Sequence, residues 1–194
     1  MAAFFDPAQF KPLMVLHQNW RMIREECAAL DRNDIASFER GGLSHAAITK
    51  KMVENGRMQW VKAWGAHKDK WLNWGFALYD QYPLGDAGVP KTVALLKHVR
   101  GLKVAALALF KPGVLLPIHR HPELKAENLL TFHLGLEAPK DHCYLNVDGK
   151  FAREEEGKAI VFDGSLPHYA FNASGAERLI LYCEFSPQRL RWID

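Results

Sequence analysis

The sequence is poor in cysteine and has no apolar segment long enough to cross a bilayer. Three cysteines, Cys27, Cys143 and Cys183, are scattered along the chain without a C-x-x-C pair. This pattern argues against a disulfide framework and against a cysteine-rich zinc site. The longest apolar runs, such as "VAALALF", fall far short of the roughly 20 residues that a membrane-spanning helix needs. We therefore expect three buried thiols and no interaction with a membrane.

Signals for secretion, nucleic-acid binding and several enzyme classes are also missing. The start "MAAFFDPAQFKP" lacks the basic residues and apolar centre of a secretory signal, so we expect a cytoplasmic protein. The formal net charge is +3 and no stretch concentrates Lys and Arg, so we expect no nucleic-acid partner. The sequence contains no H-E-x-x-H helix, no phosphate-binding glycine loop and no G-x-S-x-G turn. A small-molecule or peptide substrate remains the expected partner, and the oligomeric state stays unknown.

The chain has enough apolar residues for one core, because 48% of its 194 residues are hydrophobic. We expect a single domain over residues 1–194, with a helical part at 10–58 and a β part at 60–186. A second short helix is predicted from Ser44 to Gly56 by good capping residues, and its weak apolar face predicts a peripheral position. The first helix is predicted by one stripe of apolar residues at spacings of three and four: Leu13, Leu16, Trp20, Ile23, Cys27 and Leu30.

The second part of the sequence alternates with a period of two, as half-buried strands do. After a short helix in "KTVALLKHVRG", the predicted strands are "KVAALALF", "VLLPIHRH", "NLLTFHLGLE", "CYLNV", "KAIVF", "HYAFN" and "RLILYCEF". "VDGK" is a strong hairpin signal, since Asp-Gly tolerates the positive φ angles of a type I′ turn. The expected fold is mainly β: a jelly roll, or double-stranded β-helix, braced by N-terminal helices.

Three histidines indicate a metal site. His119 and His121 lie two apart in "PGVLLPIHRHPE", so on a strand both side chains would point to one face. His168, in "VFDGSLPHYAFN", is the best candidate for a third ligand from a distant strand. A single histidine is more often a hydrogen-bonded core or surface group, but the three together favour ligation of a metal.

The same residues resemble the two motifs of the cupins. "G-VLLPI-HRH" and "G-KAIVF-DGSLP-H-YAF-N" place Gly113, His119, His121, His168 and Asn172 at cupin positions. The glutamate that a cupin has a few residues after H-x-H is out of register here.

A closer resemblance is to the aspartyl/asparaginyl β-hydroxylase family of Fe(II)- and 2-oxoglutarate-dependent oxygenases. It covers about residues 10 to 185 and rests on "FKPGVLLPIHRHP", "FHLGLEAPKDHCYLNVDGK" and "EEGKAIVFDGSLPHYAFNASGAERLILYCEF". The resemblance implies that His119 and His168 bind iron. It also implies that Arg178 holds the distal carboxylate of 2-oxoglutarate, as a planar guanidinium can, and that His133 lies near the co-substrate. No catalytic residue beyond the metal ligands is implied.

The sequence departs from this family at several positions. His121 stands where the family has Asp or Gly. Three roles are open: a third metal ligand, an imidazole that hydrogen-bonds near the ligands without binding the metal, or a side chain that points outwards. Thr131 stands where a basic residue often precedes "HLGL", and Ala108 where a hydroxyl is expected. Two alternatives also stay open at the co-substrate positions. Arg178 could form a surface ion pair, for example with Glu184. His133, the histidine of "HLGL", could be a core residue that is hydrogen-bonded to the backbone.

Two functions follow from these patterns. The first is a 2-oxoglutarate-dependent dioxygenase that hydroxylates an unactivated C–H bond of a small-molecule or peptidyl amino-acid substrate. The alternative is a cupin-like three-histidine metal protein, either a dioxygenase that does not use 2-oxoglutarate or a non-catalytic ligand sensor.

Overall fold

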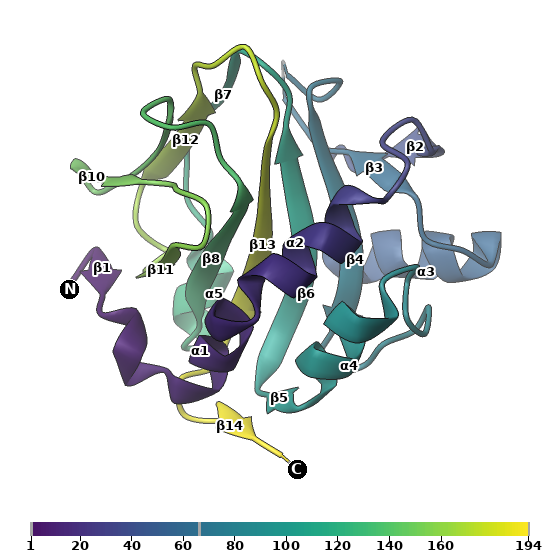
Figure 1. The fold of residues 1–194 in the computed structure, drawn as a ribbon, viewed down its shortest axis with the longest axis horizontal. Coiled ribbons are helices and arrows are strands. Elements are labelled where there is room, and N and C mark those ends of the chain that lie inside the picture. The colour runs from purple at the N-terminus through teal and green to yellow at the C-terminus, as the bar shows by residue number, and fades with distance from the viewer. Residues whose placement is uncertain (1, 66, 194) are drawn as a thin grey trace.

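The computed structural model describes residues 2–65 and 67–193, and it confirms a mainly β fold with helices packed on it (Figure 1). An eight-stranded sheet has the order β1-β11-β8-β13-β6-β4-β3-β2 and a four-stranded sheet the order β10-β9-β12-β7. The strands of the large sheet are β1 (Phe4–Phe5), β2 (Ile35–Glu39), β3 (Trp60–Lys62), β4 (Trp71–Leu78), β6 (Leu102–Phe110), β8 (Leu130–Glu137), β11 (Ala159–Phe162) and β13 (Arg178–Phe185). The small sheet contains β7 (Val114–His119), β9 (Cys143–Val147), β10 (Lys150–Arg153) and β12 (His168–Asn172), and a separate pair joins β5 (Val99–Arg100) to β14 (Arg191–Trp192).

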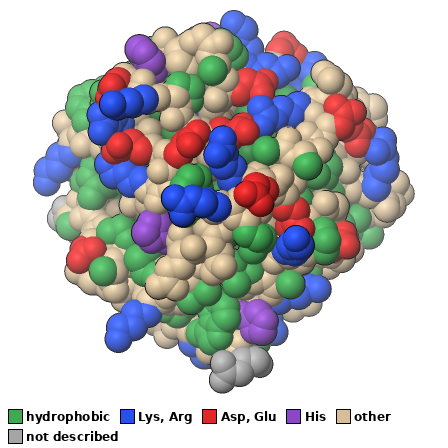
Figure 2. Space-filling view, in the orientation of Figure 1, with side chains coloured by type: hydrophobic (Ala, Val, Ile, Leu, Met, Phe, Trp, Pro, Cys, Tyr) green, Lys and Arg blue, Asp and Glu red, His purple; other side chains and the backbone are tan. Residues whose placement is uncertain are grey.

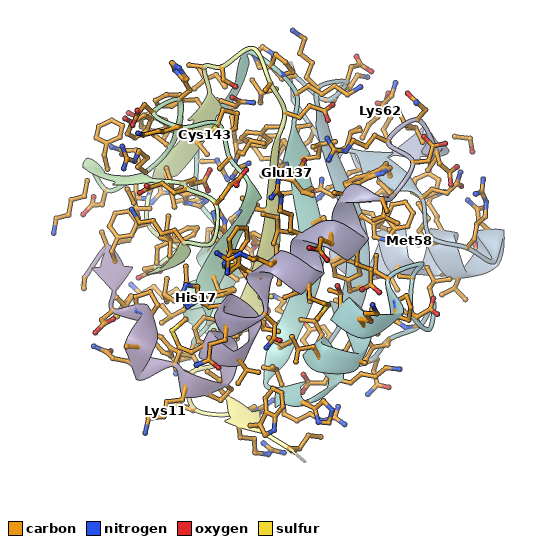
Figure 3. The ribbon with its side chains drawn as sticks, viewed as in Figure 1. Lys11, His17, Met58, Lys62, Glu137 and Cys143 are labelled. Atoms are coloured by element: carbon orange, nitrogen blue, oxygen red, sulfur yellow. The ribbon has the colours of Figure 1, made fainter. Side chains whose placement is uncertain are left out.

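Helices α1 (Lys11–Gln18), α2 (Trp20–Ala28) and α4 (Pro90–Lys97) cover the outer face of the large sheet, while the small sheet closes over its inner face (Figure 1). The helices are η1 (Pro7–Gln9), α1 (Lys11–Gln18), α2 (Trp20–Ala28), α3 (His45–Asn55), α4 (Pro90–Lys97) and α5 (Pro122–Ala126). One apolar core lies between the large sheet and the helices, and a second lies between the two sheets. Side chains fill these spaces in Figure 3, where Met58 marks the α3 side and Cys143 the small sheet. The second core is the one that surrounds the candidate site.

The predicted first helix is present as two helices. Leu13, Leu16, Ile23 and Cys27 are fully buried, which confirms the apolar stripe. The helix divides at Asn19, whose side-chain Nδ2 donates a 2.8 Å hydrogen bond to the carbonyl oxygen of Val15. An amide side chain that competes for helical carbonyl groups bends a helix at such a position. On the α2 side of the molecule, acidic and basic side chains are interspersed (Figure 2).

Helix α3 has the predicted caps and, as expected of a peripheral helix, only one buried side chain among its 11 residues. The Ser44 hydroxyl oxygen accepts from the backbone N–H of Ala47, and Gly56 ends the helix with a φ of 75°. That side chain, Met52, is 1% exposed and belongs to the main core. The apolar face is weak because one long side chain provides most of the burial.

Other local predictions are confirmed. Asp148 and Gly149 have φ angles of 49° and 78°, which are the two positive values of a type I′ turn between β9 and β10. The three cysteines are free and buried. Among the described residues, no helix combines the length and the apolar character that a membrane crossing requires.

Replacing Gly135 with alanine is expected to destabilise the protein. A Cβ atom at this position of β8 would lie 2.0 Å from the backbone carbonyl oxygen of Glu155, so the backbone would have to move. We expect a loss of about 1–3 kcal/mol in the free energy of unfolding, measured by urea denaturation. Gly175→Ala is the control, because a Cβ there meets nothing within 4 Å. Equal stabilities of the two variants would contradict the close approach.

Candidate metal centre

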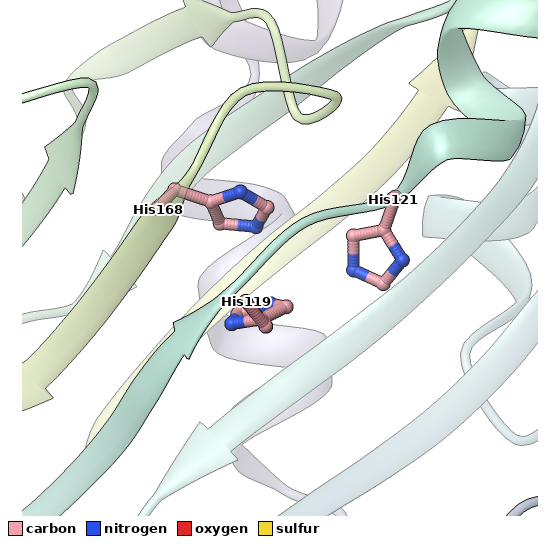
Figure 4. Close-up of side chains that lie close together, drawn as sticks. All are labelled: His119, His121 and His168. Carbon is pink, nitrogen blue, oxygen red and sulfur yellow. The ribbon is translucent and has the colours of Figure 1, made fainter.

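The structure brings His119, His121 and His168 together into one cluster, as the sequence predicted (Figure 4). One ligand nitrogen from each side chain lies within 4.8 Å of the others. The ring centroids of His119 and His168 are 4.2 Å apart, and His121 lies 5.1 Å and 5.6 Å from them. Three imidazoles converging on one point are a donor set suited to a divalent transition metal.

Two of these histidines are held opposite each other by neighbouring strands. His119 is the last residue of β7 and His168 is the first residue of β12, and their Cα atoms are partners in the antiparallel ladder. A register shift follows between His168 and Ala170. Such an irregularity re-aims a side chain at the end of a strand.

His121 reaches the cluster by a different route from the one predicted. It does not share a strand with His119, because β7 ends at His119 and His121 is the residue before α5. Its backbone N–H donates to the carbonyl oxygen of Gly164 at 3.1 Å. The expectation that both histidines extend from one strand is therefore wrong, although the ring still points at the other two.

Each histidine uses its Nδ1 atom outside the cluster. Nδ1 of His119 lies 2.8 Å from the carbonyl oxygen of Pro117, and Nδ1 of His168 lies 2.8 Å from that of Leu166. Since a carbonyl oxygen only accepts, Nδ1 carries the proton in both rings and Nε2 keeps a lone pair. Nδ1 of His121 lies 3.0 Å from Glu123 Oε1, an acceptor of the same kind. Partners of this type fix the tautomer and orientation of metal-binding histidines.

Burial also keeps the His119 and His168 rings neutral. Burial, opposed by the Pro117 carbonyl, lowers the pKa of His119. Burial and then the neighbouring His119 lower the pKa of His168 to about 3. Neutral imidazole is the form that binds a metal, so the donor set fits a divalent cation at neutral pH.

Arg178 lies deeper in the same cavity and is already paired. It is 1% exposed, its Nε is 2.5 Å from Glu154 Oε2, and its Nη2 donates to Glu154 Oε1 at 2.8 Å. Nδ1 of His133 donates to the same Oε1 atom at 2.8 Å. The guanidinium carbon lies 4.2 Å from the centre of the Phe110 ring. Among the described residues, Nη1 of Arg178 has no hydrogen-bond partner.

This arrangement decides between the alternatives left open by the sequence. A surface ion pair for Arg178 is wrong, since the side chain is buried and its partner is Glu154. His133 is buried, but it bonds a carboxylate and not the backbone. Burial alone would raise the pKa of Glu154, but the Arg178 charge and the hydrogen bond from His133 lower it to about 2. Glu154 is therefore ionised and balances the guanidinium charge.

The cluster and Arg178 line one cavity of about 140 Å³ between the two sheets. Trp64 and Trp71 line it beside His119, and the Trp64 ring lies 5.2 Å from the His119 ring. Thr131 and Ala108, where the sequence departs from the family pattern, also line it. The hydroxyl of Thr131 is buried without a hydrogen-bond partner among the described residues.

Sequence reasoning missed three residues of this region. Glu154 is the first of three consecutive glutamates, and nothing local distinguishes it from its exposed neighbours. Arg40 and His45 line the cavity from the end of β2 and the start of α3, in a part of the chain expected to be a helical brace. The capping signal at Ser44 located the helix but not the surface it would cover.

Comparisons with known proteins identify the family of this chain. The family model described as "Aspartyl/Asparaginyl beta-hydroxylase" matches residues 17–187. An ornithine lipid ester-linked acyl 2-hydroxylase of Rhizobium tropici is 36% identical over 98 residues, which is 50% of this chain and 34% of that protein. The aspartyl/asparaginyl beta-hydroxylase of Mus musculus is 32% identical over 111 residues, which is 54% of this chain and 15% of that protein. The matches therefore span about a third or less of these relatives' lengths.

Solved structures give only weak matches. A predicted oxalate decarboxylase from Thermotoga maritima aligns over 60% of this chain and 80% of its own, with 14% identity and a TM-score of 0.40. KdgF from Halomonas sp. aligns over 64% and 84%, with 13% identity and a TM-score of 0.39. Similarities of this size carry no information about activity.

Proposed function

Because the chain belongs to the aspartyl/asparaginyl β-hydroxylase family, we propose that it is an Fe(II)- and 2-oxoglutarate-dependent hydroxylase of a small-molecule or peptidyl substrate. The observation that carries this proposal is the cluster of three imidazoles in a cavity that also contains a buried arginine. His119, His168 and His121 would hold the iron through their Nε2 atoms. When bound, the iron with its co-substrate supplies the oxidising chemistry, in which O₂ and 2-oxoglutarate give succinate, CO₂ and a hydroxylated carbon.

The role of Arg178 is to bind the distal carboxylate of 2-oxoglutarate. Its Nη1 group is the donor that supports this role, because it is buried in the cavity wall and has no protein partner among the described residues. Glu154 and Phe110 hold the guanidinium in place from the other sides. A guanidinium fixed in this way needs little reorganisation when an anion binds.

The apolar wall excludes water from the cavity. Phe110, Leu116, Leu145 and Phe162 belong to the core between the sheets and also line the cavity. Charges interact more strongly where water is excluded. The chain thus provides an open metal position, a fixed donor and a dry pocket.

One observation favours the second candidate, a three-histidine metal protein that does not use 2-oxoglutarate. Glu154 already balances the charge of Arg178, so a dianionic co-substrate would meet a neutral pair instead of a free cation. Binding measurements separate the two candidates.

The deciding experiment is an anaerobic titration of the metal-free protein with Fe(II), with and without 2-oxoglutarate. We expect one Fe(II) per chain and a weak visible absorption band only when 2-oxoglutarate is also present. Arg178→Gln should weaken 2-oxoglutarate binding while Fe(II) binding stays unchanged. If the wild-type protein binds Fe(II) but shows no visible absorption band when 2-oxoglutarate is added, the three-histidine alternative is favoured and the 2-oxoglutarate-dependent function is excluded.

A further inference from the structure

The cavity extends beyond the metal cluster towards α3, and this extension has a distinct chemistry. Ile48, Thr49 and Met52 of α3 line it on one side. On the other side the inner faces of β4 and β6 present small residues: Gly75, Ala106 and Ala108. Small side chains on adjacent strands leave space that larger ones would fill. The result is an apolar extension between the helix and the sheet.

The charged side chains among the described cavity-lining residues are two arginines, since the His45, His119 and His168 rings are neutral. Among the described lining residues are two arginines and five histidines, with no aspartate, glutamate or lysine: Arg40, Arg178, His45, His119, His121, His133 and His168. A cavity lined in this way favours an anionic ligand. The two arginines, however, are not equivalent.

Arg178 is balanced by Glu154, whereas Arg40 has no acidic partner. Within the described part of the chain, no carboxylate lies within 4.0 Å of the Arg40 guanidinium; its hydrogen-bond partner is His45, at 3.3 Å from Nη2 to Nε2. Burial and the Arg40 charge lower the pKa of His45 to about 3. His45 is therefore neutral and accepts the hydrogen bond through Nε2, which orients the guanidinium without cancelling its charge.

The nearest buried acid does not neutralise Arg40 either. Glu184 forms no ion pair with Arg40 within 4.0 Å; its Oε1 lies 3.8 Å from Nε2 of His45, and the Arg40 charge only opposes the rise of its pKa. Glu184 is held by the hydroxyl group of Tyr182, which donates to it at 2.7 Å, and it lies 3.9 Å from Lys103 Nζ. Burial raises the pKa of Glu184. Arg40 thus keeps an unpaired positive charge at the cavity wall.

Arg40 is also held in position close to the metal cluster. Its backbone N–H donates to the carbonyl oxygen of Lys62 at 2.8 Å, immediately after β2 ends. Its charge contributes to the lowered pKa of His119. Because Arg40, the histidine cluster and the α3 residues line the same cavity, an anion on Arg40 would lie in the cavity that contains both the cluster and the apolar extension.

We infer that Arg40, oriented by His45, binds the carboxylate of the substrate, and that the substrate's apolar chain lies in the extension beneath α3. The substrate class is then a carboxylate with a short apolar chain. The extension is only one part of the cavity of about 140 Å³, so the apolar chain that fits it is short, and hexanoate is a suitable probe. The identity of this ligand as substrate rests on the proposed hydroxylase function, but its binding does not require iron.

The experiment is a titration of the metal-free protein with hexanoate, followed by the fluorescence of Trp64 and Trp71 in the cavity wall and by calorimetry. We expect saturable binding that Arg40→Gln weakens about 10- to 100-fold, the range for a lost charged hydrogen-bond pair. Hexanol, which has the same chain without the charge, should bind both proteins equally. Arg57→Gln is the matched control, because Arg57 is exposed and pairs with Asp34. Its hexanoate affinity should equal that of the wild type.

Two results would overturn the inference. One is hexanoate binding that is absent in the wild type or unchanged in Arg40→Gln. The other is a loss of 2-oxoglutarate binding in Arg40→Gln with hexanoate binding intact, since Arg40 would then serve the co-substrate. If Arg40→Gln does not fold, Arg40→Lys keeps the charge but not the planar fork and should bind hexanoate with intermediate affinity. If the wild-type protein binds hexanoate through Arg40 but does not bind iron, the proposed hydroxylase function is disproved and the carboxylate site at Arg40 is retained.

Discussion

Replacing His168 with alanine is expected to abolish hydroxylase activity and to lower the affinity for Fe(II) by at least about 100-fold. Removing a residue that only hydrogen-bonds to a metal ligand already costs about 10- to 100-fold in metal affinity. His168 is itself a proposed ligand, so its removal should cost more. Its Nε2 faces the cluster because Nδ1 is fixed by the Leu166 carbonyl group. Anaerobic calorimetry with Fe(II) measures the affinity directly.

The control for this variant is His142→Ala. His142 is an exposed histidine outside the cluster, so the same substitution there should leave Fe(II) affinity unchanged. Thermal unfolding of the metal-free proteins shows whether His168→Ala is folded. An Fe(II) affinity of folded His168→Ala equal to that of His142→Ala would contradict the proposed centre.

His121→Ala distinguishes the remaining roles of the third histidine. His121 lies outside the strands and contacts Glu123 at the surface. If it is a ligand, its removal should weaken Fe(II) binding as strongly as His168→Ala does. A loss of about 10- to 100-fold would instead indicate a residue that supports a ligand, and a smaller loss would indicate no role at the metal; in both cases the iron would have two protein ligands.

Replacing Glu154 with alanine is expected to destabilise the protein by about 3–5 kcal/mol, because it leaves the Arg178 charge buried and unpaired. The side chains of both residues are 1% exposed, so water cannot take over the lost interaction. Urea denaturation measures the loss. Glu155→Ala is the matched control: Glu155 is the next residue, its ion pairs with Arg153 and Lys158 lie at the surface, and such pairs contribute about 0–1 kcal/mol.

The same pair makes stability depend on pH in a defined direction. The pKa of Glu154 is about 2 in the folded protein, against an ordinary value of 4.5. The unfolded chain therefore binds this proton first as the pH falls. The stabilisation is complete above pH 4.5 and is lost between pH 4.5 and 2. A double variant, Glu154→Leu with Arg178→Met, should lose this pH dependence and be less destabilised than Glu154→Ala, since no unpaired charge remains. A single variant as stable as Glu155→Ala would disprove the buried pair.

The sequence by itself determined most of the β part and the two principal histidines. The period-two pattern located β6, β8, β9, β12 and β13, because alternation of buried and exposed side chains is a local property of each strand. His119 could be selected by its spacing of two from His121, and His168 by its position after a strand and a Gly-Ser turn. The resemblance to a family then indicated Arg178 and His133, which the structure places along the same cavity.

Only the tertiary structure decided the electrostatics of the site. Three consecutive glutamates look alike in the sequence, yet Glu154 alone of them is buried against Arg178, which is 24 positions away. His121 joins the cluster through a loop held by Gly164, and Arg40 reaches the cavity from a strand that pairs with β3. Charge pairing depends on which side chains meet across the folded chain and on how much water they lose. Neither quantity is encoded in the local periodicity of the sequence.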